Sequence, residues 1–204
     1  MNVKTKKAEQ SEVTQAALLR AARELFAERG YAGTATEEVV ARAGVTRGAL
    51  YHQFRDKEDL FRAVYAQIEA EFAEKISARI RSRTPRGASA WDEFIEGAQG
   101  YLDVALDRDV QRIALLDAPS VIRSSAGREV GRFGLGLLHR GLQRCIDQGF
   151  IAEQPVEPLA HLLRAALTEA AMLIARSPDH AAMRRDAGAA VERLLGGLRV
   201  GAGS

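Results

Sequence analysis

An all-α fold is predicted by three features of this chain of 204 residues. Ala, Leu, Arg and Glu dominate the intervals between its prolines and glycines, and runs of β-branched residues are missing. Apolar residues recur at spacings of three and four positions, as on one face of a helix. Hydrophobic residues make up 47% and charged residues 27% of the chain, a balance typical of globular proteins. Together these features predict an all-α fold.

Glycines and short polar residues divide the first part of the chain into helices. Gly30 and Gly44 are expected to end the first two helices, because glycine readily leaves the helical conformation. Thr36 and Thr46 can cap the second and third helices with their side-chain oxygens. The first four helices are expected at Ser11–Arg29, Thr36–Ala43, Thr46–Phe54 and Lys57–Arg83.

The segment SRTPRGAS, at Ser82–Ser89, concentrates turn-forming residues, and its proline cannot continue the fourth helix. Composition thus marks a junction there. Further helices are expected near Ala90–Leu106, Asp109–Leu116, Ser125–Gln148, Val156–Arg176 and Asp179–Leu198, separated mainly by prolines at 119, 155, 158 and 178. We expect two domains, residues 1–60 and 61–204, with the fourth helix joining both halves.

Several classes of protein are disfavoured by the composition. No stretch offers the roughly 20 apolar residues of a membrane span, and the N-terminus lacks the apolar core of a secretion signal, so a cytoplasmic location without membrane association is expected. The single cysteine, Cys145, excludes an internal disulfide; it is read as a small buried residue, with a redox or intermolecular role as the alternative. The formal net charge of +2 does not by itself indicate a nucleic-acid partner.

The third expected helix has the residue types of a surface that reads DNA. Two short helices separated by a glycine-containing turn have the size of a helix-turn-helix. The second of them carries Arg47, Tyr51, His52 and Gln53, which offer polar groups, beside the small residues Gly48 and Ala49. Glycine within a helix costs about 1 kcal/mol relative to alanine, so Gly48 suggests close approach to a groove.

The run GVTRGALYHQFRDKEDLF from Gly44, preceded by TATEEVVARA and FAERGY, closely resembles the TetR family over roughly Ser11 to Phe61. This resemblance implies an all-α homodimer with an N-terminal three-helix, helix-turn-helix DNA-binding domain and a C-terminal helical domain for ligand binding and dimerisation. It also implies a repressor, released from a palindromic double-stranded DNA operator by an unknown small-molecule effector, with no cofactor. The operator, the effector and the choice between repression and activation stay open.

The resemblance also assigns roles to individual residues. Thr36 would contact a phosphate, and Thr46, Arg47, Gly48 and Ala49 would form the groove-facing start of the recognition helix. Tyr51 and His52 would reach the backbone or the bases, and Lys57 would hold a phosphate at the start of the fourth helix. Arg47 could bind guanine or only a phosphate, Tyr51 could pack inward, and His52 and Lys57 could be solvated. Lys4, Lys6 and Lys7 could form a flexible basic arm or only a solvated tail.

The second half of the chain is expected to supply a dimer face and a ligand pocket. The dimer face is expected on the last two helices, at Leu159, Leu163, Ala166, Leu167, Ala170, Ile174, Leu194 and Leu195; the same residues could instead form intrachain core. The pocket candidates are apolar or polar residues of the middle helices, namely Trp91, Phe94, Tyr101, Arg112, Leu115, Phe133, Leu137, His139, Glu169 and Met172.

No catalytic or metal-binding motif is found in the sequence, and the four histidines are scattered, so an enzyme is not expected. Two rival interpretations remain. The same motif could serve an activator or an architectural DNA-binding protein. Alternatively, the hairpin could be purely structural in a small-molecule carrier or enzyme.

Overall fold

The computed structural model describes residues 3–122 and 132–200, and side chains in 8–122 and 134–200. In these ranges the chain is helical apart from turns and one isolated bridge between Ile151 and Arg199, so the predicted all-α fold is confirmed. The helices are α1 (Val3–Arg29), α2 (Thr36–Ala43), α3 (Arg47–Gln53), α4 (Lys57–Arg83), α5 (Ala90–Val104), the π-helix η1 (Val110–Asp117), α6 (Ala118–Val121), α7 (Arg132–Asp147), α8 (Val156–Arg176) and α9 (His180–Gly196).

Most boundaries agree with the sequence, but three expectations are corrected. Helix α1 begins at Val3, so the lysines at 4, 6 and 7 continue it and do not form a separate arm. Ala35, not Thr36, is the N-cap of α2, and the Glu38 carboxylate accepts a hydrogen bond from the Ala35 N–H at 3.2 Å. Pro158 lies in the first turn of α8, where a missing N–H costs nothing, and Pro119 lies at the start of α6, which continues directly from η1. The expected start of a helix at Ser125 lies outside the described residues.

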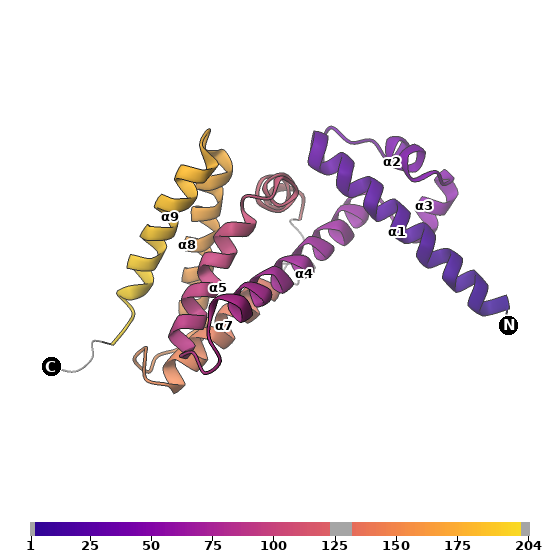
Figure 1. The fold of residues 1–204 in the computed structure, drawn as a ribbon. Coiled ribbons are helices and arrows are strands. Elements are labelled where there is room, and N and C mark those ends of the chain that lie inside the picture. The colour runs from indigo at the N-terminus through magenta and orange to yellow at the C-terminus, as the bar shows by residue number, and fades with distance from the viewer. Residues whose placement is uncertain (1–2, 123–131, 201–204) are drawn as a thin grey trace.

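The molecule has two ends joined by one long helix (Figure 1). Helices α1, α2 and α3 gather at one end and α5 to α9 at the other, while α4 runs between them. The first turns of α4 belong to the N-terminal core, because Phe61 packs edge-on against Phe26 with ring centroids 5.1 Å apart. Its later turns pack against α5 and α7. Helix α4 therefore belongs to the packing of both parts and connects them.

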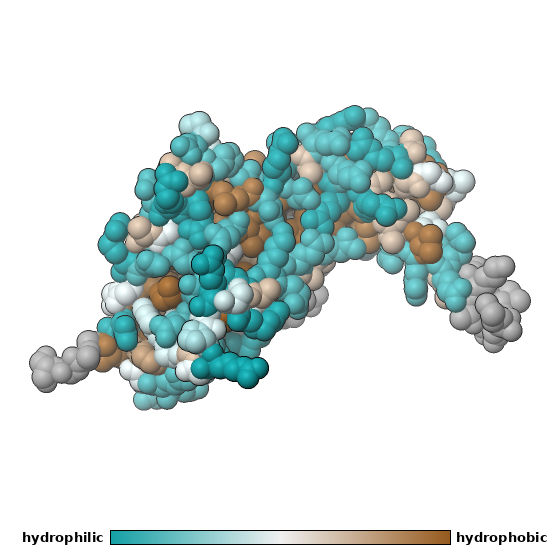
Figure 2. All heavy atoms as spheres, viewed as in Figure 1, coloured by the Kyte–Doolittle hydropathy of each residue, from teal (hydrophilic) through white to brown (hydrophobic). Residues whose placement is uncertain are grey.

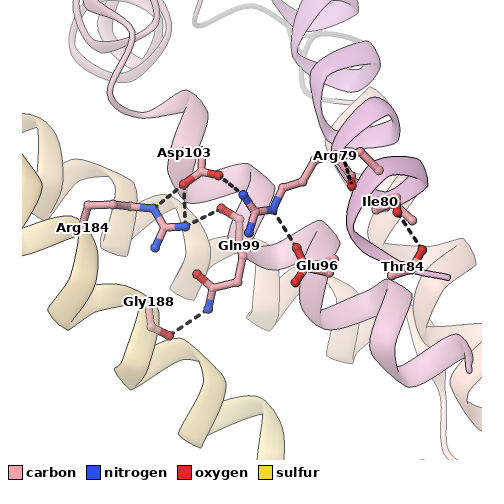
Figure 3. A network of polar contacts seen from close by, with 9 residues as sticks. Arg79, Ile80, Thr84, Glu96, Gln99, Asp103, Arg184 and Gly188 are labelled. Atoms are coloured by element: carbon pink, nitrogen blue, oxygen red, sulfur yellow. Dashed lines mark hydrogen bonds and ion pairs between the residues drawn. The ribbon is translucent and has the colours of Figure 1, made fainter. Parts of the chain in front are cut away.

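A polar network fixes the end of α4 to two other helices (Figure 3). Arg79 of α4 pairs with Asp103 of α5, and its Nε lies 2.9 Å from Glu96. Arg184 of α9 donates to Asp103 at 2.8 Å and to the Gln99 carbonyl at 2.9 Å. The two guanidinium groups share one carboxylate, so α4, α5 and α9 are held in one arrangement.

Helix α8 belongs to the core of the C-terminal part. Among the described residues it alone is long and apolar enough to cross a membrane by length and composition. It packs against α5, α7, α9 and η1, and its Leu163, Leu167 and Ile174 are buried within the chain. The face in Figure 2 is largely hydrophilic, with apolar residues gathered near the middle, between the two ends. Helix α8 is thus accounted for as a core helix.

Cys145 of α7 is fully buried, and burial raises the pKa of its thiol to about 11. We expect this thiol to react with the disulfide reagent DTNB at pH 8 at least about 100-fold more slowly in the native protein than in guanidinium chloride, because the thiolate fraction falls tenfold per pKa unit. The neutral thiol stabilises the folded state below its unfolded pKa, and this contribution is lost as the pH rises towards 11. Equal native and denatured rates would favour a redox role.

Candidate nucleic-acid interface and ligand cavities

Helix α3 is anchored by its inner residues and capped at its start. The Thr46 hydroxyl accepts a hydrogen bond from the Ala49 N–H at 3.2 Å, as expected for a helix cap. Leu50 is fully buried and Phe54 nearly so, and both belong to the core formed with α1 and α4. The outer side of α3 is therefore held in a fixed orientation.

The outer side of α3 is exposed and contributes no negative charge of its own, although the Glu37 carboxylate of α2 lies 3.6 Å from the Arg47 guanidinium. Thr46, Arg47, Gly48, Tyr51 and His52 are exposed, and Ala49 is half-buried. No Asp or Glu occurs between Gly44 and Arg55. The Arg47 guanidinium lies 5.6 Å from the centroid of the Tyr51 ring, and Tyr51 is 45% exposed, so it faces outward.

Gly48 has free space around it. Within the described residues, a Cβ built at this position would meet only the Thr46 hydroxyl oxygen, at 4.0 Å. No contact in this part of the chain requires a glycine, although glycine weakens the helix. The open surface would let a partner approach the backbone of α3 closely.

Two further contacts position the site from outside α3. The Gln53 amide donates to the Ser11 hydroxyl at 2.7 Å, which ties the end of α3 to α1. Gln53 was expected on the outer face, and its anchoring role could not be found from the sequence because Ser11 is 42 residues away.

The Lys57 amine lies 4.3 Å from the centroid of the Tyr31 ring, and burial lowers the pKa of Lys57. Thr36 and Lys57 both lie at helix N-termini, where the amides favour anions.

Two of the cavities in the described C-terminal part share Tyr101 and Gly134. The first has a volume of about 310 Å³ and includes Tyr101 and Leu115 among its walls. The second has a volume of about 260 Å³ and includes Phe94, Tyr101 and Leu137. The sequence interpretation missed the wall that α4 contributes, at Tyr65, Ile68 and Phe72, although a long apolar face on this helix was recognised.

The other pocket candidates lie outside these two linings, although Trp91 and His139 each line a further, more open hollow. Trp91 lies beneath the Arg199 guanidinium, Arg112 is 3.4 Å from Asp117, and His139 is 3.9 Å from Glu157. Glu169 is exposed, and Met172 packs half-buried against the core outside both linings. The side chain of Phe133 lies outside the described part of the structure.

The proposed dimer stripe divides into buried and exposed residues. Leu163, Leu167, Ala170, Ile174 and Leu195 are buried within a single chain, so they form intrachain core. Leu159 and Ala166 are half-buried, whereas Leu194 is 54% exposed. Leu162 and Leu173, which were not among the predicted dimer residues, are 68% and 49% exposed on the outer side of α8. Large exposed apolar side chains that share a face indicate a contact surface.

Hydrogen bonds and ion pairs connect η1, next to the first cavity, with the N-terminal helices. The Asp117 carboxylate accepts a hydrogen bond from the Tyr31 N–H at 2.7 Å, and Asp109 accepts one from Arg23 at 2.8 Å. The Arg112 guanidinium lies against Gly30, where a Cβ would be 1.9 Å from its Nη2. Val110 and Leu115 of the same helix line the first cavity. One helix thus contacts both the cavity and the N-terminal domain.

Residues 18–64 match the bacterial regulatory proteins of the tetR family, and residues 91–198 match the tetracyclin repressor-like C-terminal domain. The chain belongs to the TetR family. The chain is thus a DNA-binding transcriptional regulator, as its N-terminal sequence predicted, and α3 lies within the matched N-terminal segment.

Several known proteins are similar in sequence or structure to most of this TetR-family chain. The transcriptional repressor AcnR of Corynebacterium glutamicum is 42% identical over 148 residues, which cover 66% of this chain and 78% of AcnR. The Tn10 TetC protein of Escherichia coli is 30% identical over 122 residues, 60% of this chain and 59% of that protein. A TetR-family regulator from Pectobacterium atrosepticum is 40% identical, with a TM-score of 0.78 over 94% of this chain and 97% of its own.

Proposed function

We propose that this TetR-family regulator is a homodimeric repressor whose two α3 helices bind a palindromic operator and are withdrawn when a small molecule enters the first cavity. The exposed start of α3 carries this proposal. It presents a guanidinium beside open space at Gly48, on a helix whose inner side is locked into the core. We expect the protein to act in the cytoplasm, where its operator would lie.

Two copies are needed to read a palindrome. In a symmetric dimer, recognition helices enter successive major grooves about 34–36 Å apart. The exposed leucines of α8 and α9 provide a self-complementary apolar face for such a pair. We therefore place the second copy against Leu162, Leu173 and Leu194.

The cavity and α3 would communicate through two elements. Helix α4 lines the cavity with Ile68 and Phe72 and enters the N-terminal core at Phe61. The π-helix η1 lines the same cavity and holds the N-terminal domain through its Asp117 and through Asp109, the residue that precedes it. A ligand that fits one arrangement of these helices better than the other would shift the spacing of the two α3 helices.

Arg47→Ala tests the assignment of the DNA-reading surface. We expect it to weaken binding to duplexes selected by the wild-type protein from a random library by about 5- to 150-fold, because a bidentate guanine contact contributes roughly 1–3 kcal/mol. Fluorescence anisotropy gives the affinity, and sedimentation velocity should show an unchanged oligomeric state.

Arg83→Ala is the control, because Arg83 is an exposed arginine at the far end of α4. It should bind the selected duplexes like the wild type. If Arg47→Ala kept both the wild-type affinity and the wild-type sequence preference, α3 would not be the reading helix.

A further inference from the structure

The first cavity has apolar walls and one cluster of polar groups. Ile68, Phe72, Val110 and Leu115 provide hydrocarbon surface around a volume of about 310 Å³. The polar groups are Tyr65, Glu69, Tyr101, Arg164 and Thr168. A cavity of this size and composition holds a small ligand that is largely apolar and carries few polar atoms.

The acidic group of the cavity is already engaged. The Tyr65 hydroxyl donates to the Glu69 carboxylate at 3.0 Å, and Glu69 has a further interaction. Burial and the charge of Glu69 both raise the pKa of Tyr65, which keeps its hydroxyl protonated as a donor. Glu69 therefore does not offer a free site for a cationic ligand.

Arg164 has no such partner among the described residues. This half-buried residue of α8 lines the cavity, and within residues 3–122 and 132–200 it forms no hydrogen bond or ion pair. The Arg164 charge lowers the pKa of Tyr65 and of Tyr101, although burial raises both pKa values by more. A half-buried guanidinium that makes no ion pair within the described residues can take an anionic ligand as its partner.

Two hydroxyl groups lie beside this guanidinium. Thr168 is one helical turn after Arg164 on α8, and its Oγ1 is 3.1 Å from the Tyr101 Oη. The pair has two hydroxyl hydrogens and uses one between its members, so the other is available to donate to a ligand. Arg164, Thr168 and Tyr101 thus offer a guanidinium and a hydroxyl donor, which together match a carboxylate.

We propose that the effector is a small amphipathic monocarboxylate, bound by Arg164 together with Thr168 and Tyr101, with its hydrocarbon part against Ile68, Phe72 and Leu115. This inference rests on the proposed function, since it names the ligand class of the same cavity. A dianion would be disfavoured, because Glu69 lines the same space. The cavity volume limits the ligand to about the size of a single aromatic ring with a short chain.

The test compares acids with their uncharged equivalents on the DNA-free protein. Aliphatic and aromatic monocarboxylates of about six to ten carbons, each paired with its primary amide, are titrated by calorimetry and by thermal shift. We expect at least one acid to bind, at least about tenfold more tightly than its amide. Equal binding of acid and amide, or no binding by any acid of the panel, would overturn the assignment.

Substitutions then locate the charge. Arg164→Met keeps the length of the side chain and should lower the affinity for the acid at least about 30-fold while leaving amide binding unchanged. The affinity of Arg164→Lys for the acid should lie between those of the wild type and Arg164→Met, because lysine keeps the charge but lacks the two parallel donors of the guanidinium. Arg176→Met, an exposed arginine on the same helix, is the control. Wild-type affinity in a folded Arg164→Met protein, as judged by circular dichroism, would also refute the proposal.

A separate titration of the protein bound to its selected duplex distinguishes the two proposals. An acid that binds the free protein but leaves the DNA complex intact would contradict the release mechanism and support the ligand class. Release by a neutral amide as effective as its acid would contradict the ligand class and support the release mechanism.

Discussion

A protein carrying both Leu162→Asp and Leu173→Asp is expected to be monomeric and to lose its affinity for a palindromic duplex. The two leucines are 68% and 49% exposed and lie three helical turns apart on the outer side of α8. In a symmetric dimer each substitution occurs twice, and each lost leucine contact removes about 1.5 kcal/mol. The total of about 6 kcal/mol would raise the dimer dissociation constant by about 10⁴-fold. Sedimentation velocity over a dilution series measures it.

The control for this double variant is an exposed leucine on another face. Leu106→Asp, at a position 41% exposed after α5, should leave the dimer intact. Leu163→Asp does not test the dimer interface, because Leu163 is buried within one chain and a charge there would unfold the subunit itself. A double variant that sedimented as a wild-type dimer would move the interface away from α8.

The N-terminal helices could be predicted closely because their boundary signals are local. Thr46 caps α3 through a residue three positions away, and Gly44 ends α2 with a left-handed backbone at φ +66°. The start of α1 could not be predicted, since no cap or breaker precedes Ser11 to mark it. The cap of α2 was misplaced by one residue, because Glu38 provides the carboxylate where Thr36 was expected to provide a hydroxyl.

The dimer face and the cavity depend on packing that periodicity does not contain. Helix α8 is apolar on two sides, and the pattern does not say which side meets α5, α7 and α9 of the same chain. Leu163 is buried within the chain whereas Leu162 is exposed, and a difference of one position on a helix is a rotation of about 100°. Likewise, an apolar face on α4 predicts burial, but it does not distinguish a wall of solid core from a cavity wall at Ile68 and Phe72.

Gly30→Ala is expected to destabilise the protein by about 2–3 kcal/mol in denaturant unfolding. Gly30 adopts φ +74°, a left-handed conformation that costs a residue with a Cβ about 1–2 kcal/mol. The new methyl group would also lie 1.9 Å from Nη2 of Arg112 and displace it. Arg112 would then lose its position 3.4 Å from Asp117, the carboxylate that accepts the Tyr31 N–H. Beyond the backbone cost, the substitution thus disturbs the contact between η1 and the DNA-binding domain.

Gly44→Ala separates these two costs. Gly44 has a similar φ of +66°, but within the described residues a Cβ there meets nothing within 4 Å. The Gly44→Ala variant should therefore lose only about 1–2 kcal/mol of folding stability, which is the backbone cost alone. Equal losses for the two alanine variants would mean that the Arg112 contact at Gly30 adds nothing to stability.

A double-mutant cycle then tests whether Arg112 is the residue displaced. Arg112→Ala removes the clash, so the double variant Gly30→Ala/Arg112→Ala should be less destabilised than the sum of its single variants, by about 1 kcal/mol. If the losses were additive, the methyl group would be accommodated without moving Arg112. In that case the link from η1 to the recognition domain would depend on Asp117 and Asp109 alone, since their bonds to Tyr31 and Arg23 do not involve Gly30.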